Sequence, residues 1–400
     1  MHTSPIDPGS AGTVIVGMSG GVDSAVAALL LQQAGFTVQG LFMSNWEDED
    51  AYCTAAEDFQ DARRACETLN IPLHRVSFAA EYRERVFAHF LREYAAGRTP
   101  NPDVLCNREI KFGLCLDYMR RLGASWIATG HYARLRRTDR GTQLLKAVDS
   151  AKDQSYFLHG VAPAALANTL LPIGELRKDE VRRLAHAAGL AVFDKPDSTG
   201  ICFIGERPFQ KFLSRYLHTA PGPIENAGGE VVGEHRGLAL YTLGQRSGLR
   251  VGGRAGAAAA PWYVAAKDAR RNALIVVQDP EHPLLMSDTF DVEQVHWLCA
   301  PQPLSLDRDR DGFECGVKTR YRQADLLCRV RPGSDGRVRV RLLGPARAVT
   351  PGQYAVFYRD DLCLGGGVIS RTSNACDAQG TPAPADGALA YNSEFTLEGS

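Results

Sequence analysis

The sequence predicts an α/β protein: a parallel sheet covered by helices, then a small mostly-β region and an antiparallel β-barrel. In the first third of the chain, strand-like apolar runs alternate with helical segments, the pattern of a parallel sheet with helices on both faces. From Met286 to Ser370, short alternating segments follow one another between turn sequences, as in a small barrel. The length of 400 residues also favours two or three domains over one.

The predicted sheet is built from short apolar runs, and the segments between them are rich in helix-forming residues. We expect strands at Thr13–Met18, Thr37–Met43, Leu73–Phe78 and Trp126–Thr129, and helices at Ser24–Ala34, Thr54–Leu69, Glu81–Ala96 and Arg108–Leu122. Ligands of such sheets bind outside the carboxyl ends of the strands. We therefore expect functional residues in the loops that follow these strands.

Proline and glycine dominate the middle of the chain. Pro221–Ile224 (PGPI) and Gly248–Ala260 are predicted to be turns and loops, with short strands at Trp262–Ala265 and Leu274–Val277. In the barrel we expect strands at Arg337–Leu343 and Tyr354–Tyr358, separated by the turn sequences RPGSDG, TPGQ and LGGG. The predicted domains are residues 12–208, 209–284 and 285–370. Residues 371–400 lack periodicity, and we predict a disordered tail there.

Composition argues against several classes of protein. No apolar run reaches the length of about 18 residues that a membrane helix needs, and residues 1–12 do not resemble a signal or transit peptide. We expect a cytoplasmic enzyme with no membrane partner. The ten cysteines are scattered and include no CxxC pair, so we expect neither a disulfide scaffold nor a structural zinc site. Most of these thiols are predicted to be buried and inert.

The formal net charge of −1 does not by itself indicate a nucleic-acid partner. Basic residues are nevertheless in excess between Asp311 and Ser370, with ten Lys and Arg against six Asp and Glu. A phosphate-binding surface needs only such a local patch. A solvated surface of mixed charge is the alternative.

Residues 17–24 (GMSGGVDS) follow the first predicted strand and open the first helix. Two glycines let the backbone approach an anion, the helix amino terminus offers N–H groups, and Ser19 and Ser24 add hydroxyls. Val22 and Asp23 stand where a Walker loop has Gly and Lys. An acidic residue there suits Mg²⁺ that bridges to phosphate. The alternative is a glycine turn that packs the helix onto the sheet.

The string NPDVLCNR at 101–108 carries the first candidate cysteine. Pro100 and Pro102 are expected to hold the chain extended before a helix. Asp103 and Cys106 would then face the same side of its first turn, where the helix terminus lowers a thiol pKa. Asp103 could act as general acid or base, although its charge opposes thiolate formation. Alternatively, Asp103 caps the helix and Cys106 is a packing residue.

Cys202 is the second candidate and lies in DSTGICFIG at 197–205. Its apolar neighbours make a buried, inert cysteine a plausible alternative. The flanking DSTG and GERPF sequences indicate a strand bounded by flexible turns, which would let the thiol move.

The string SGGVDS resembles the PP-loop of ATP pyrophosphatases, which have an adenine nucleotide alpha hydrolase-like fold, release pyrophosphate and transfer AMP to an oxygen. The resemblance implies an ATP site, and the Mg²⁺ ion that the acidic Asp23 suits would bind there. Its implied phosphate-binding residues are Gly17, Met18, Ser19, Gly20, Gly21, Val22, Asp23 and Ser24, with adenine contacts from Met43 and Gly130.

Further strings extend the resemblance from Val14 to Ser370. SGGVDS, NPDVLCN, TGHYAR, KDQSYFL, DSTGICFIGERPF, YTLGQR and KTRYR occur in this order, and together they are similar to the bacterial-type tRNA-specific 2-thiouridylase family (MnmA). The family resemblance implies that ATP adenylates the C2 oxygen of the wobble uridine. It further implies that Cys202 carries a persulfide sulfur and that Cys106 assists by forming a transient disulfide with Cys202.

The same resemblance implies the partners. These are the anticodon region of tRNA, a sulfur-relay or cysteine desulfurase donor protein, and a cellular reductant; we expect a monomer. Asn101, Pro102 and Asp103 are expected to line the pocket for the flipped base. The other implied tRNA contacts are His131, Lys152, Asp153, Gln154, Arg320, Tyr321 and Gln353. His131 could instead be a core or capping residue, and Arg320 and Arg322 a solvated strand face.

Two other functions stay open at this point. An amide-forming PP-loop synthetase would adenylate a carboxylate and would need no cysteine pair. A non-catalytic RNA-binding module would need neither ATP turnover nor the cysteines. Replacing Cys106 or Cys202 would abolish the activity of a thiolase but not that of an amide-forming synthetase. Release of pyrophosphate on adding tRNA would exclude a non-catalytic RNA-binding module.

Overall fold

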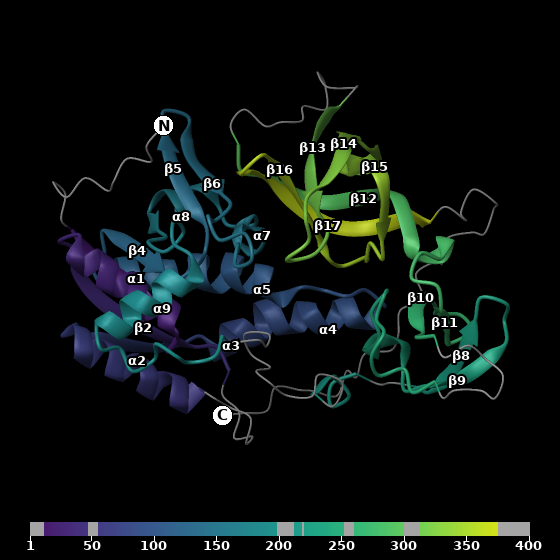
Figure 1. Cartoon of the computed structure of the whole chain (residues 1–400), viewed down its shortest axis with the longest axis horizontal. Helices are drawn as coiled ribbons and strands as arrows, with labels where there is room; N and C mark the ends of the chain where they lie inside the picture. Colours follow the sequence, from purple (N-terminus) through teal and green to yellow (C-terminus); the bar gives the residue numbers. More distant parts are fainter. Residues whose placement is uncertain are drawn as a thin grey trace.

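The structure is a computed structural model that describes residues 12–46, 55–197, 212–217, 220–251, 260–299 and 312–374. Three domains follow one another along the chain (Figure 1). The parallel-sheet domain occupies the left of the view, the barrel the upper right and the small central sheet the lower right. This is the α/β architecture, with its β-rich second half, that the sequence predicts.

The amino-terminal domain is built on a parallel sheet with strand order β3-β2-β1-β4-β7. Its strands are β1 Thr13–Met18, β2 Thr37–Ser44, β3 Leu73–Ser77, β4 Trp126–Thr129 and β7 Thr169–Leu170. The first four are the predicted ones, with shifts of at most one residue. The strand β7 was not predicted, because two residues are too few to show a periodicity.

Successive residues of β1 point to opposite faces of this sheet. Val14 and Val16 pack with α1 (Val22–Gln33), α2 (Ala55–Leu69) and α9 (Lys178–Ala187). Ile15 belongs to a second apolar cluster, formed with the helices of the other face. Both faces of the sheet are therefore covered, which leaves the edge formed by the strand ends for ligands.

The second face is covered by two composite helices that each contain a π-helical stretch. In the first, η2 (Arg83–Phe87) joins α3 (Ala79–Tyr82) to α4 (Ala88–Ala95). In the second, η3 (Cys106–Leu114) joins α5 (Pro102–Leu105) to α6 (Cys115–Arg121). This helix starts six residues earlier than expected, because Pro102 is its first residue rather than part of an extended segment. Proline is favoured there because an N–H group at this position would have no partner within the helix, so its absence in proline costs nothing.

A hairpin that the sequence did not reveal connects the first domain to the barrel. The strands β5 (Arg134–Thr138) and β6 (Gly141–Leu145) extend the barrel sheet, with Leu145 opposite Leu362. The short helices α7 (Ser155–Leu158) and α8 (Pro163–Ala167) follow. The hairpin is mostly charged on its exposed side, which hides the alternation of a strand.

The central domain is a four-stranded sheet of order β10-β11-β8-β9. Its strands are β8 Gly222–Asn226, β9 Val231–His235, β10 Tyr263–Asp268 and β11 Ala273–Val277. The prediction of a turn at Pro221–Ile224 was wrong, because β8 begins at Gly222. Pro223 is tolerated since pairing with β11 starts only at Ile224. A side chain at Gly222 would come within 2.2 Å of the Asn272 carbonyl oxygen.

The last domain is a closed antiparallel barrel of order β12-β15-β14-β13-β16-β17, in which β17 also pairs with β12. Its strands are β12 Met286–Trp297, β13 Phe313–Lys318, β14 Leu326–Pro332, β15 Val338–Arg347, β16 Tyr354–Arg359 and β17 Leu362–Asn374. In β15 the side chains of Val338, Val340 and Leu342 are buried and the residues between them are exposed, which is the predicted alternation.

Two expectations for the end of the barrel were wrong. The LGGG sequence is not a turn, because Leu364–Gly367 lies within β17; a side chain at Gly365 or Gly366 would collide with a backbone carbonyl of a neighbouring strand. The predicted tail boundary at residue 371 is also early, since β17 continues to Asn374 by pairing with β12. Residues 375–400 lie outside the described residues.

The barrel and the first domain share a buried charged contact. The Asp153 carboxylate, 4% exposed, accepts hydrogen bonds from the backbone N–H groups of Ala147 and Ser155 and from the Ser155 hydroxyl. It also pairs with Lys318 of β13 at 3.3 Å. Because each donor comes from a fixed backbone or a buried side chain, this carboxylate fixes the position of the barrel relative to the first domain.

Replacing Asp153 with Ala should destabilise the protein by about 3 kcal/mol, because Lys318 is left buried without its counter-charge. The matched control is Asp325→Ala, which removes the more exposed Lys146–Asp325 pair across the same junction and should cost about 1 kcal/mol or less. Urea unfolding followed by fluorescence measures both. Equal losses for the two variants would contradict the role given to Asp153.

His159 should make stability depend on pH. It is 1% exposed, and burial lowers its pKa to about 4, against the opposing hydrogen bond to the Tyr156 carbonyl. Between pH 6.5 and pH 4 the unfolded chain therefore binds a proton that the folded chain excludes, so stability falls as pH falls through this range. The variant His159→Gln should show a shallower decline in urea midpoints measured from pH 7 to pH 5. An unchanged slope would exclude this role for His159.

Candidate active site

The loop at residues 17–24 joins β1 to α1 at the carboxyl edge of the parallel sheet. Gly20 has φ +74°, and a side chain there would lie 2.2 Å from the Asp58 carbonyl oxygen of α2. Lys195 donates to the Gly20 carbonyl at 3.1 Å and pairs with Asp58 and Asp61 at 2.7 and 2.6 Å. The loop is therefore held from the side of α2, and its other side faces the strand ends.

The start of α1 is suited to bind an anion. Gly21 is the residue before the helix, and no side chain of the described residues caps the helix there, which leaves N–H groups of the first turn available. Ser24 donates to the Gly21 carbonyl at 3.0 Å, and its hydroxyl lies 3.2 Å from that of Ser19. The residues expected to bind phosphate thus lie together in one loop at the start of a helix, and their binding of phosphate stays a prediction.

The two predicted adenine contacts lie on either side of this loop. Met43 is at the end of β2 and Gly130 follows β4, and both strands neighbour β1. A side chain at Gly130 would come within 2.6 Å of the Asp23 and Ser24 backbone. The absence of a side chain at Gly130 therefore lets β4 end directly against the first turn of α1.

A cluster of charged side chains surrounds Asp23; we call Asp23, Tyr132, Lys152, Lys178 and Asp197 the Lys178 network. Lys178, the first residue of α9, contacts both Asp23 oxygens and one Asp197 oxygen at 2.8 Å. Tyr132 donates to Asp23 at 2.8 Å, and Lys152 pairs with Asp197. Burial alone would raise the pKa of Asp197, but the hydrogen bonds from Lys152 and Lys178 hold that pKa at about 2.

This network limits how Mg²⁺ could bind. Among the residues that the structure describes, no group of three or more His, Cys, Asp and Glu side chains could hold a metal ion. Asp23 could supply one carboxylate ligand once Lys178 moves from it. Mg²⁺ commonly takes its remaining ligands from phosphate and water, so the site fits the ion only together with a nucleotide.

The Asn101–Cys106 segment opens the composite helix of the second face. Asn101, not Asp103, is the capping residue: its side chain accepts from the Asp103 N–H at 3.2 Å. Cys106 lies in the second turn, whereas the influence of a helix terminus fades within the first turn. Activation of Cys106 by the helix terminus is therefore not supported. The Cys106 sulfur is fully buried and accepts from the Asn45 amide at 3.7 Å.

Cys202 lies outside the described residues, so the expected meeting of Cys106 and Cys202 stays a prediction. The chain is described up to Asp197, five positions before Cys202 in the sequence. Lys152, Lys178 and Arg182 all contact the Asp197 carboxylate. The same lysine therefore contacts the phosphate loop and the residue that begins the DSTGIC sequence.

Most residues expected to contact tRNA are engaged in bonds within the protein. His131 bonds to the Thr129 hydroxyl at 2.8 Å, and burial lowers its pKa to about 3, so it is neutral at pH 7. Gln154 accepts from the Tyr132 N–H. Arg320 donates to backbone carbonyls of Leu243 and Ala348. These bonds fix the positions of the three side chains.

The structure does not support a direct tRNA contact by the Asp153 side chain. Its carboxylate is buried and holds the barrel, as described above. Gln353 has a similar connecting role, because its amide donates to the Thr99 carbonyl at 2.8 Å. The turn that contains Gln353 thus fixes the backbone just before Asn101. If Gln353 contacts RNA, it does so while its amide is close to Thr99.

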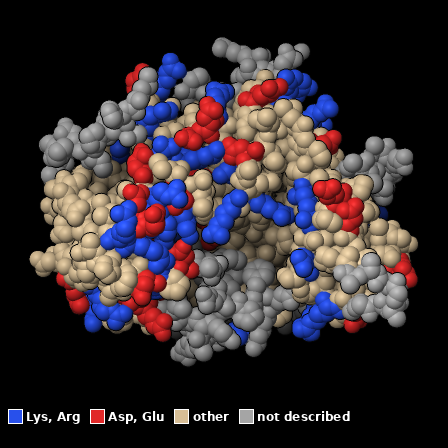
Figure 2. Space-filling view, viewed as in Figure 1, with Lys and Arg blue, Asp and Glu red and all other residues tan. Residues whose placement is uncertain are grey.

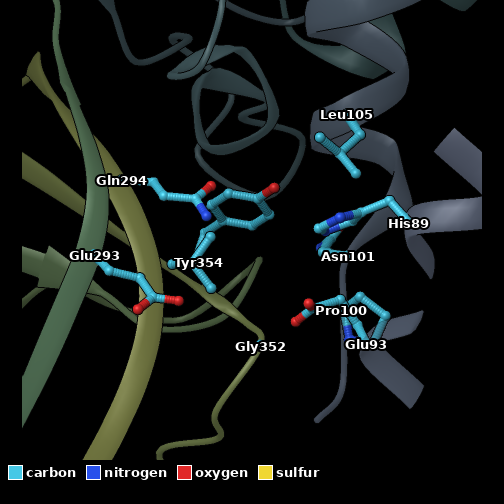
Figure 3. A pocket seen from close by; sticks show the side chains of 10 residues that line it. His89, Glu93, Pro100, Asn101, Leu105, Glu293, Gln294, Gly352 and Tyr354 are labelled. Carbon is cyan, nitrogen blue, oxygen red and sulfur yellow. The ribbon is translucent and has the colours of Figure 1, made fainter. Parts of the chain in front are cut away.

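A small pocket lies between the two domains beside Asn101 (Figure 3). His89 of α4 and Asn101 face Gln294 of β12 and Tyr354 of β16 across it. Its volume of about 20 Å³ suits a single water molecule. No sequence pattern could have identified this pocket, because its walls come from two domains that meet only in the folded protein.

An arginine-rich groove of about 340 Å³ lies where the barrel meets the central domain. It is lined by Gly244, Arg320, Tyr321, Arg322, Gln323 and Arg347. Two of these are predicted tRNA contacts. In Figure 2, lysine and arginine side chains also border the hollow between the parallel-sheet domain and the barrel, and another group lies over α9. Such surfaces favour a polyanionic partner.

Three family models match the chain in the order of its domains. They are described as tRNA methyl transferase HUP domain (residues 12–206), tRNA methyl transferase PRC-barrel domain (210–278) and aminomethyltransferase beta-barrel domain (287–369). Curated relatives named tRNA-specific 2-thiouridylase MnmA match nearly the full length. The relative from Idiomarina loihiensis is 54% identical, and the match covers 90% of this chain and 96% of the relative. The relative from Chromohalobacter salexigens is 55% identical, and the match covers 92% of this chain and 95% of the relative.

The chain belongs to the MnmA family of tRNA-specific 2-thiouridylases. The resemblance that the sequence motifs indicated is thereby confirmed. Among solved structures, an NMN synthetase from Francisella tularensis is 22% identical with a TM-score of 0.32, covering 51% of this chain and 72% of its own. Within the described residues, no helix is both long and apolar enough to cross a membrane.

Sequence reasoning missed three residues of the site. Lys178 and Lys195 come from a region without a recognised motif, and only the fold brings them to the loop. Asn45 could have been found, because it directly follows a strand of the parallel sheet at the edge where ligands bind.

Replacing Gly20 with Ala should disrupt the loop, because the new side chain meets the Asp58 carbonyl and the backbone has a positive φ. We expect a lower melting temperature and at least tenfold weaker ATP binding, about 1.4 kcal/mol. The matched control is Gly21→Ala, where φ is −101° and the nearest atom is 3.4 Å away. This control should keep its melting temperature. Equal melting temperatures for both variants would show that Gly20 is not constrained.

Proposed function

We propose that this protein is a sulfurtransferase that converts the wobble uridine of tRNA to 2-thiouridine, with ATP as the activating substrate. Family membership supports the reaction class. The observation that carries the proposal is the contact between Cys106 and Asn45. Asn45 continues β2, the strand beside β1, which ends in the phosphate loop. At about 3.3 Å per residue, Asn45 lies roughly 10 Å beyond the last pair of β1 and β2, so a buried thiol and the loop share one edge.

In the proposed first step, the uridine O2 attacks the α-phosphorus of ATP and pyrophosphate leaves. The phosphate loop and the start of α1 would bind the phosphates, and Lys178 could move from Asp23 to the new negative charge. Mg²⁺ at Asp23 would neutralise phosphate charge in the same place. AMP on O2 turns a poor leaving group into a good one.

In the proposed second step, the terminal sulfur of a Cys202 persulfide attacks C2, and AMP leaves with the oxygen. The Cys106 thiolate then attacks the Cys202 sulfur. The sulfur–sulfur bond breaks, and its electron pair stays on the sulfur attached to C2, which yields 2-thiouridine and a Cys106–Cys202 disulfide. A thiol reductant restores both cysteines, and a donor protein reloads Cys202. A role of Asp103 as general acid or base belongs to this proposal.

The substrate would be bound between the domains. Asn101 and its pocket lie beside the helix that carries Cys106, and the arginine-rich groove lies on the barrel side. Phosphates of the anticodon arm suit the groove, and a flipped base suits the strand edge. Cytoplasmic location and a monomeric state remain predictions.

The cysteines provide the decisive experiment. Purified protein is incubated with tRNA, ATP and a persulfide donor, and the digested nucleosides are examined by mass spectrometry for 2-thiouridine. Cys106→Ser and Cys202→Ser should abolish thiolation but keep tRNA-dependent release of pyrophosphate. Cys115→Ser, a buried residue of the same composite helix, is the matched control and should remain active.

Other outcomes identify the competing functions. An amide-forming synthetase would keep full activity without either cysteine. A binding module would release no pyrophosphate, and a methyl transferase would give a methylated rather than a thiolated nucleoside. Full thiolation by both serine variants would contradict the proposal.

A further inference from the structure

Asn45 donates to the Cys106 sulfur, and its buried side-chain oxygen has no partner among the residues that the structure describes. It follows Ser44 at the end of β2, on the edge of the sheet where the phosphate loop lies. Its side-chain N–H donates to the Cys106 sulfur at 3.7 Å. Its side-chain oxygen is buried, and no hydrogen-bond partner for this oxygen is found among the described residues. The Asn45 amide therefore directs its N–H group to the Cys106 thiol, while its oxygen remains available to accept a hydrogen bond from a ligand.

The donor half of this amide favours an anionic sulfur. A hydrogen bond from a neutral N–H to a charged acceptor is stronger than one to a neutral acceptor. Since the helix terminus is one turn away from Cys106, the Asn45 amide is a local source of stabilisation for the thiolate. The proposed attack on the Cys202 sulfur needs this thiolate.

The acceptor half indicates a ligand with an N–H group. A buried polar atom without a hydrogen bond costs about 1–3 kcal/mol, so its retention calls for an explanation. The uracil ring carries one N–H group, at N3, and N3 is bonded to C2, the carbon that would receive sulfur. In the proposed mechanism, Cys106 attacks the Cys202 sulfur while the transferred sulfur is bonded to C2. An acceptor beside Cys106 would therefore lie close to C2 and could face the N–H next to it. Cytosine has no proton at N3.

We propose that Asn45 is a positioning and specificity residue: its oxygen accepts the N3–H of the unmodified uracil ring, and its N–H stabilises the Cys106 thiolate. The inference rests on the proposed function and assigns the base class that the site selects. It concerns binding before adenylation, since N3 loses its proton when O2 receives AMP. Asn45 thus excludes cytidine from the site before ATP is consumed.

Binding without ATP tests the acceptor half. Anticodon stem-loop RNAs carry uridine, 3-methyluridine or cytidine at the wobble position, and fluorescence anisotropy gives their affinities. The wild-type protein should bind the uridine RNA about tenfold more tightly than the other two, since one hydrogen bond of about 1.4 kcal/mol is a tenfold effect. Asn45→Ala should reduce this ratio to below about twofold. Asn45→Asp keeps an oxygen acceptor and should retain the preference.

The pH dependence of sulfur transfer tests the donor half. In single-turnover reactions, the rate should rise with pH as Cys106 ionises. Asn45→Ala and Asn45→Asp both lack the N–H, so this rise should move to higher pH, by more in the Asp variant because its charge opposes the thiolate. The matched control is Asn107→Ala. Asn107 is the neighbour of Cys106, and its buried oxygen also has no partner within the described part of the chain, but its amide donates to the Phe157 carbonyl. This control should keep the wild-type pH profile.

The outcomes separate the two proposals. If the wild-type protein forms no 2-thiouridine, the proposed function fails. If it forms 2-thiouridine but binds uridine and 3-methyluridine RNAs equally, the role of the Asn45 oxygen is overturned. This comparison needs no variant and holds even if Asn45→Ala fails to fold. A wild-type pH profile in Asn45→Asp, with an unchanged melting temperature, overturns the role of the Asn45 N–H.

Discussion

The parallel pairing of β1 with its neighbours β2 and β4 is the constraint on which the site depends. Because all three strands run in one direction, their carboxyl ends meet at one edge, and the segments that follow them are brought together. The phosphate loop follows β1, Asn45 follows β2 and Gly130 follows β4. The helices cover both faces with apolar side chains, so this edge is the place left where polar groups can meet a ligand.

Charge then determines how the edge is organised. Lys195 holds the loop against α2, and Lys178 connects Asp23 to Asp197. Both lysines have carboxylate partners, which balance their charge next to the loop expected to bind phosphate. The Asp153–Lys318 pair acts at a different level, because it is buried and fixes the barrel against the first domain. Residues expected to contact tRNA thus also hold the domains in the arrangement that tRNA would meet.

The sequence predicted the first sheet well because its strands are buried on both faces and form continuous apolar runs, such as TVIVGM in β1. It failed where side chains hide the backbone pattern. The charged hairpin β5–β6 was missed, and PGPI and LGGG were taken for turns although each belongs to a strand. In both cases glycine marks a close approach of neighbouring backbone, which a composition rule cannot distinguish from a turn. The sequence also offered Asp103 as the helix cap, whereas the structure has Asn101 in this role. Asn and Asp side chains can both cap a helix, so the residue type alone could not decide between them.

The sequence by itself determined the family, and it identified the candidate phosphate loop and the candidate cysteines, because these depend on residues that are contiguous in the chain. The tertiary structure decided which side chains serve them. Lys178, Lys195 and Asn45 come from separate elements, and only the strand order and the packing of α9 and α2 place them around the loop and the Cys106 thiol. The contacts of Lys178 and Lys195 arise from folding across long sequence distances, so no local pattern records them, whereas Asn45 has a local signal in its place directly after a strand.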